Sequence, residues 1–97
     1  MAVVEVITFR AAAGANDSAV QHADEHVQTE FAYQQRGLVR RTTARGASGE
    51  WLVVQLWQSA GDADAAASAA RTHASFDRLL RLIDHATLRV ARYETLD

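Results

Sequence analysis

Two histidines four residues apart, His22 and His26 in the stretch QHADEHVQTEF, have a spacing that could bind a metal ion. On a helix they would share one face, and two imidazoles on one face can ligate zinc. Helical periodicity, however, places Val20, Val27 and Phe31 on the apolar stripe and both histidines on the opposite side. No other element is expected to supply a third ligand there. The sequence therefore predicts a surface helix and no metal site.

Three other side chains are candidates for catalysis, and each has a structural alternative. Trp57 could stack on a flat aromatic substrate or could pack in an interface. Glu5 could act as a general base, or could form a buried ion pair with Arg89 on a neighbouring strand. His73 lies near a helix end, where it could transfer protons at neutral pH or simply be solvated.

Composition excludes several classes of function. The chain has 97 residues with a net charge of −2, so it carries no global attraction for nucleic acid or anionic lipid. It contains no cysteine, which excludes disulfides, thiolate metal sites and cysteine nucleophiles. No apolar run reaches the length of a membrane span, and the first residues read as a strand rather than a signal peptide. We expect a cytoplasmic protein.

The elements that must position these side chains follow from periodicity and turn signals. Alternating or β-branched segments predict strands over residues 3–10, 38–45, 50–58 and 87–94. Helices are predicted over 18–35 and 62–71, and a third short helix carries an apolar stripe of Phe76, Leu79, Leu80 and Ile83. The expected caps are Asn16 or Asp17, Gly37, and Ser59 with Asp62.

The resulting order, β-α-β-β-α(α)-β, is the ferredoxin-like split β-α-β arrangement of the α+β class. It predicts one domain over residues 1–97, with all helices on one face of a four-stranded antiparallel sheet. Strand parity groups the purely apolar Leu52, Val54 and Leu56 on one face, which we expect the helices to cover.

The opposite face would then be uncovered and rich in aromatic side chains. Its expected members are Glu5, Ile7, Phe9, Trp51, Val53, Gln55, Trp57, Arg89, Ala91 and Tyr93. Such a patch is too large for a monomer in water, so we expect a homodimer with its two sheets face to face. Gln55 and Tyr93 could there donate hydrogen bonds to a bound carbonyl or quinone.

The segments VVEVITFR, GLVRR and WLVVQLWQSAGDADAA resemble those of the antibiotic biosynthesis monooxygenase-like family, within the dimeric α+β barrel superfamily. The resemblance covers essentially the whole chain. It implies a homodimer with a small pocket in each subunit, and in some members oxidation of aromatic phenols or quinols by oxygen without a cofactor.

Two departures from the family pattern bear on function. The haem-degrading branch has an asparagine in strand one and a tryptophan in the second helix, where this chain has Glu5, Ile7 and alanines, so haem degradation is not expected. Many members open the last helix with a His-Phe pair. Here the pair is Ser75-Phe76, with His73 two residues earlier as a substitute.

The resulting hypothesis is a cofactor-independent monooxygenase that acts on a small aromatic or polyketide-like molecule. Its expected catalytic residues are Trp57, Glu5 and His73, and its expected substrate-binding residues are Gln55, Arg89, Tyr93 and Phe9. The alternative is a non-catalytic dimeric protein that binds a small hydrophobic ligand or serves in a stress response. Neither a metal nor a cofactor is expected.

Overall fold

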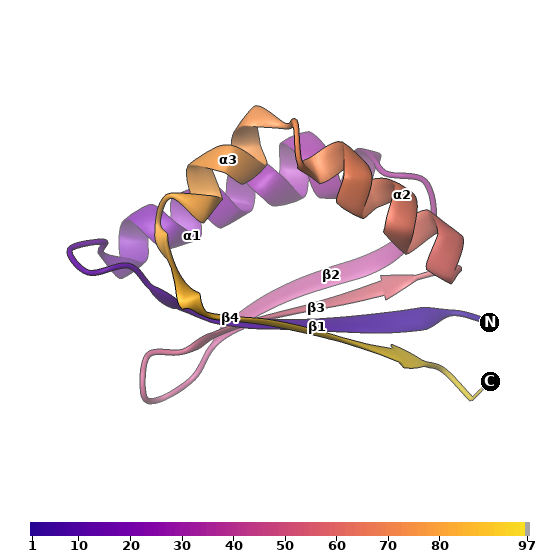
Figure 1. Cartoon of the computed structure of the whole chain (residues 1–97), viewed down its shortest axis with the longest axis horizontal. Helices are drawn as coiled ribbons and strands as arrows, with labels where there is room; N and C mark the ends of the chain where they lie inside the picture. Colours follow the sequence, from indigo (N-terminus) through magenta and orange to yellow (C-terminus); the bar gives the residue numbers. More distant parts are fainter. Residues whose placement is uncertain (97) are drawn as a thin grey trace.

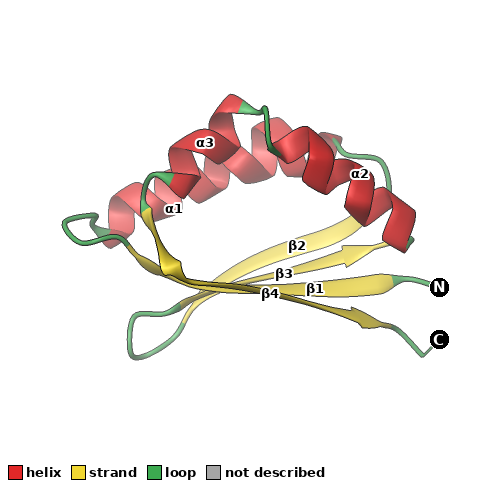
Figure 2. Cartoon of the chain, viewed as in Figure 1, coloured by secondary structure: helices red, strands yellow, loops and turns green. Residues whose placement is uncertain are grey.

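A computed structural model describes residues 1–96, and it is an α+β fold of two layers (Figures 1 and 2). Its elements, in order, are β1 (Val3–Ala11), α1 (Asp17–His26), the π-helix η1 (Val27–Phe31), the 3₁₀ turn η2 (Ala32–Gln34), β2 (Leu38–Arg45), β3 (Trp51–Trp57), α2 (Ala60–Ala70), α3 (Ala74–Leu80) and β4 (Ile83–Glu94). Within these residues, no helix is long and apolar enough to cross a membrane.

The four strands form one antiparallel sheet in the order β2-β3-β1-β4, and all the helices lie on one side of it (Figure 1). This confirms the predicted ferredoxin-like arrangement. The expected signals for the starts of the helices are also confirmed. The Asn16 side chain accepts a hydrogen bond from the Ala19 amide at 2.8 Å, and the Ser59 hydroxyl accepts one from the Asp62 amide at 3.1 Å. The expected cap at Gly37 is wrong, because the helix is capped at Gln35 and Gly37, with φ +87°, lies in the turn that leads into β2.

Two element boundaries differ from the prediction. The first long helix changes from α to π geometry at Val27 and ends in a 3₁₀ turn. The last strand begins at Ile83, which the sequence pattern assigns to the stripe of the third helix. Ile83 pairs with Ala11 beyond an irregularity where β4 carries extra residues relative to β1, so its backbone bonds to the sheet rather than continuing α3.

The predicted assignment of sheet faces is wrong for β1 and β3. Trp51, Val53 and Trp57 are buried under the helices, each at most 5% exposed, and so is Phe9. Strand parity correctly predicts that these residues share one face of the sheet. The prediction that the helices leave this face uncovered is wrong. On β4 the assignment holds, because Val90 lies on the helix side and lines the pocket beneath the helices.

The face without helices, called the outer face from here on, is therefore aliphatic rather than aromatic. Register places Val4, Val6, Leu52, Val54, Leu56, Ala91 and Tyr93 on it. The helices explain why the aromatic face is the covered one and the aliphatic face is not. The buried residues of α2 are alanines, Ala63 and Ala66, which leave depth above the sheet for the indole ring of Trp57. The helices also supply carboxylates that pair with the polar side chains beneath them.

Candidate functional site

A row of polar side chains crosses the whole sheet beneath the helices. Register places Arg41, Gln55, Glu5 and Arg92 directly opposite one another on β2, β3, β1 and β4. The Arg41 Nε donates to Gln55 Oε1 at 3.2 Å, and Gln55 Nε2 donates to Glu5 Oε1 at 3.2 Å. Arg92 Nη2 donates to Glu5 Oε2 at 3.0 Å. The four side chains thus form one continuous hydrogen-bonded row.

At each end of this row, the arginine pairs with an aspartate from a helix. Arg41 forms a two-pronged contact with Asp24 of α1, at 2.6 and 3.3 Å, and both side chains are at most 7% exposed. Arg92 Nη1 donates to Asp64 of α2 at 2.8 Å. The hydrogen bonds to Asp64 and Glu5 raise the pKa of the Arg92 guanidinium above its ordinary value. The row therefore ties both α1 and α2 to the sheet.

The Glu5 carboxylate is saturated with donors. Its Oε1 accepts from Trp57 Nε1 at 2.8 Å in addition to Gln55, and its Oε2 accepts from Arg92 Nε at 3.3 Å in addition to Nη2. A carboxylate offers about four acceptor positions, and all of them are used here. Proton abstraction by Glu5 would require one donor to withdraw, and the neutral Gln55 amide is the weakest of the four.

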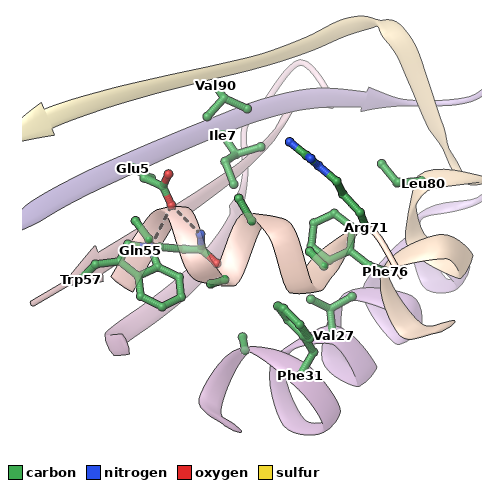
Figure 3. A pocket seen from close by; sticks show the side chains of 15 residues that line it. Glu5, Ile7, Val27, Phe31, Gln55, Trp57, Arg71, Phe76, Leu80 and Val90 are labelled. Carbon is green, nitrogen blue, oxygen red and sulfur yellow. Dashed lines mark hydrogen bonds between the residues drawn. The ribbon is translucent and has the colours of Figure 1, made fainter. Parts of the chain in front are cut away.

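A cavity of about 240 Å³ lies between this row and the helices (Figure 3). Its walls are mostly apolar and come from η1, η2, α2, α3 and three of the strands. The lining residues are Glu5, Ile7, Val27, Phe31, Ala32, Gln55, Trp57, Ala63, Ala66, Ala67, Ala70, Arg71, Phe76, Leu80 and Val90. Four of them are alanines of α2, so the small side chains of that helix create the space.

The wall opposite α2 includes the π-helical segment, because Val27 and Phe31 are its first and last residues. A π-turn widens the helix locally, and such turns occur often at functional sites. The Phe31 ring packs edge-on against Phe76 of α3, with ring centroids 6.1 Å apart. The aromatic wall is thus assembled from two helices.

The structure brings three of the expected site residues together at the cavity: Trp57, Glu5 and Gln55 (Figure 3). It places the other expected residues elsewhere. The Phe9 ring stacks on Trp51 in the core, with centroids 6.3 Å apart. Tyr93 lies on the outer face, directly across the register from Val4. These two residues do not line the cavity.

His73 and Arg89 also differ from expectation. The His73 ring nitrogen Nδ1 accepts from the Ser75 amide at 3.2 Å and so caps α3, and the residue is not part of the cavity lining. Arg89 pairs in register with Thr8 and donates to backbone carbonyls. The cation beside Glu5 is Arg92 instead, because it lies opposite Glu5 in the register.

Sequence reasoning missed Asp24, Arg41, Arg92 and Arg71. A signal existed for two of them. Asp24 falls on the helical stripe of Val20 and Val27, where a charge implies a buried partner. Arg92 shares strand parity with Leu88 and Val90. His22 and His26 remain exposed, and no cluster of three or more possible metal ligands occurs in residues 1–96.

The comparison with solved structures agrees with the observed fold. The chain is similar to SnoaB, a cofactor-independent oxygenase from Streptomyces nogalater, with a TM-score of 0.77 and 16% identity over 99% of this chain and 94% of that one. The resemblance expected from the sequence is thereby supported at the level of the fold.

Other solved structures share the fold. A candidate antibiotic biosynthesis monooxygenase from Chloroflexus aurantiacus J-10-fl has a TM-score of 0.73 at 15% identity, covering 100% of this chain and 95% of that one. A conserved protein from Methanosarcina mazei Go1 has a TM-score of 0.78 at 11% identity, with coverages of 98% and 93%. No protein-family model and no curated protein matches the sequence.

Proposed function

We propose that this protein is a cofactor-independent monooxygenase that oxidises a small aromatic or polyketide-like molecule in the cavity beneath α2. The observation that carries the proposal is an apolar cavity of about 240 Å³ that has Trp57 in its wall and the Glu5–Gln55 pair at one end. The likeness of the fold to SnoaB, a cofactor-independent oxygenase, supports it. A volume below that of most drug-sized pockets fits a molecule of about two or three fused rings.

In this proposal the substrate itself supplies the electrons, as an anthrone-type methylene beside a phenol would. Both hydrogens of the methylene are lost, one oxygen atom of O₂ becomes the new carbonyl of the product, and the other leaves as water. The protein holds the ring against Trp57 and excludes water with its alanine and phenylalanine walls. Gln55, through the second hydrogen of the amide that donates to Glu5, orients an oxygen of the substrate.

The direct test is oxygen consumption over a panel of anthrones and hydroquinones, with a variant whose cavity is filled. Ala67 lines the cavity but is not packed into the core, so Ala67→Leu should block the site without overpacking. Ala65 is exposed on the same helix and does not line the cavity, so Ala65→Leu is the matched control. We expect turnover in wild type and Ala65→Leu and its loss in Ala67→Leu. Turnover by none of them, or equally by all three, would refute the proposal.

A second candidate function is non-catalytic binding of the same kind of ligand. The saturated Glu5 carboxylate favours it, because the four donors leave no free acceptor to take a proton from a substrate. This alternative predicts a ligand that binds wild type and not Ala67→Leu, without oxygen uptake. Native mass spectrometry of the purified protein, compared between these two variants, separates the two functions.

We also propose that the protein forms a homodimer through the outer face. The aliphatic side chains of this face are partly exposed, and Tyr93 is 59% exposed. Apolar patches of this kind usually mark an interface. A twofold dimer would cover the outer faces of both sheets with a single contact. Sedimentation at micromolar concentration tests this proposal, and a monomeric mass would refute it.

A further inference from the structure

Among residues 1–96, Arg71, at the end of α2, is the one charged residue besides Glu5 that lines the cavity. Figure 3 shows Glu5, Gln55 and Trp57 together at one end of the cavity, and Arg71 with Phe76 and Leu80 toward the other. The Arg71 side chain extends from the helix toward the sheet, in the direction of Ile7. The two charges thus lie at different ends of an apolar space.

The two charged groups differ in their partners. Glu5 is neutralised by Arg92 and receives two further hydrogen bonds. The Arg71 guanidinium, in contrast, forms no ion pair or hydrogen bond with any residue in the range 1–96. Among the described residues, the cavity therefore presents one positive charge without a partner, carried beside its apolar walls by a residue that is itself exposed.

We infer that Arg71 selects ligands that carry a carboxylate at the end of an apolar aromatic body. A guanidinium offers paired donors whose geometry matches a carboxylate, and it binds one more strongly than a neutral amide. The aromatic body occupies the space lined by Phe31, Phe76 and Trp57, and its acidic group lies at Arg71. This inference rests on the cavity being the ligand site, which both proposed functions share.

The test compares two probes of equal size and shape, 2-naphthoate and 2-naphthamide, by isothermal titration calorimetry. Wild type should bind the naphthoate about tenfold more tightly, as expected for one partly solvated charge-assisted contact. Arg71→Gln should bring this ratio close to one by weakening naphthoate binding alone. Arg71→Lys should give an intermediate ratio, because it keeps the charge and loses the paired geometry.

Arg36 is exposed and does not line the cavity, so Arg36→Gln is the control and should keep the wild-type ratio. Naphthamide binding by Arg71→Gln shows that the variant is folded. The inference is overturned if wild type does not prefer the naphthoate, if Arg71→Gln keeps the preference, or if neither probe binds.

This experiment does not depend on turnover, so it separates the inference from the proposed oxygenase activity. A naphthoate preference that requires Arg71, without oxygen consumption on any substrate, supports the inference and refutes the oxygenase. Oxygen consumption on neutral substrates, with no effect of charge on binding, overturns the inference alone.

Discussion

The indole nitrogen of Trp57 donates a 2.8 Å hydrogen bond to the carboxylate of Glu5, and both side chains lie beneath the helices. Trp57 is 2% exposed and Glu5 is 8% exposed. The bond joins β3 to β1 at one end of the cavity and gives a buried indole N–H its partner. Trp57 and Glu5 therefore stabilise the fold as well as being candidate site residues. A substitution of either one should change the stability of the protein as well as the site.

Glu5→Gln should lower the free energy of unfolding by about 2–3 kcal/mol, because it removes the charge that Arg92 and Trp57 contact in a buried setting. Trp57→Phe should cost about 2–3 kcal/mol, because it removes the hydrogen bond and leaves a void where the larger indole ring packs. Urea unfolding of both variants and of the double variant measures their coupling. Glu94→Gln on the exposed end of β4 is the control and should change stability by less than about 0.5 kcal/mol. Additive effects of the two substitutions would contradict a direct interaction.

Two aspartates of the first helix allow a matched comparison, because each pairs with an arginine of β2. Asp24 and Arg41 have side chains that are 7% and 3% exposed, whereas those of Asp17 and Arg45 are 55% and 49% exposed. Asp24→Asn should destabilise the protein by about 3 kcal/mol, since it leaves a buried guanidinium without its anion. Asp17→Asn should cost at most about 1 kcal/mol. Thermal or urea unfolding checks both values, and equal costs would show that burial does not decide the strength of these pairs.

Val54 lies in the middle of the outer face, paired in register with Val6 and Thr42. Val54→Glu should convert the proposed dimer to a monomer, because it would bury a charge without a partner in the interface. Sedimentation velocity measures the mass, and circular dichroism verifies that the variant is folded. Ala47→Glu, in the exposed turn between β2 and β3, should leave the mass unchanged. A folded Val54→Glu variant with the same mass as a dimeric wild type would place the interface elsewhere.

Glu30, in the π-helical segment, pairs with His26 at 2.9 Å and with Arg78 at 3.3 Å. The hydrogen bond with His26, aided by the charges of His26, Arg78 and His73, lowers the pKa of the Glu30 carboxyl below 4.5. A lowered pKa in the folded state adds stability that is present above the unfolded pKa and is lost as pH falls through the folded pKa.

Glu30→Gln should therefore be less stable than wild type at about pH 7, and the difference should become smaller at about pH 3. Urea midpoints at the two pH values measure this effect. Glu25→Gln is a control on the same exposed helical surface, because Glu25 has no cation within ion-pair distance among residues 1–96. A Glu30→Gln difference of equal size at both pH values would contradict the electrostatic origin.

Local signals in the sequence determined the elements of this protein. Residues 38–45 alternate as a strand and form β2 with the predicted bounds, and the caps at Asn16 and Ser59 depend only on neighbouring backbone groups. The order of these elements then leaves few topologies, of which the ferredoxin-like sheet is the observed one. Parity also grouped Glu5, Gln55 and Trp57 on a single face, and these three residues do meet at the cavity.

Only the tertiary structure decided which face the helices cover. Alternation fixes which residues of a strand share a side, but it is symmetric between the two sides, and both sides of β3 are apolar enough to be buried. The choice depends on the fit between layers. The alanines of α2 leave room for Trp57, and Asp24 and Asp64 reach the arginines at the two ends of the polar row. These contacts join residues far apart in the chain, so no local pattern in the sequence predicts them. The cavity exists because the small side chains of α2 lie over the large side chains of the sheet.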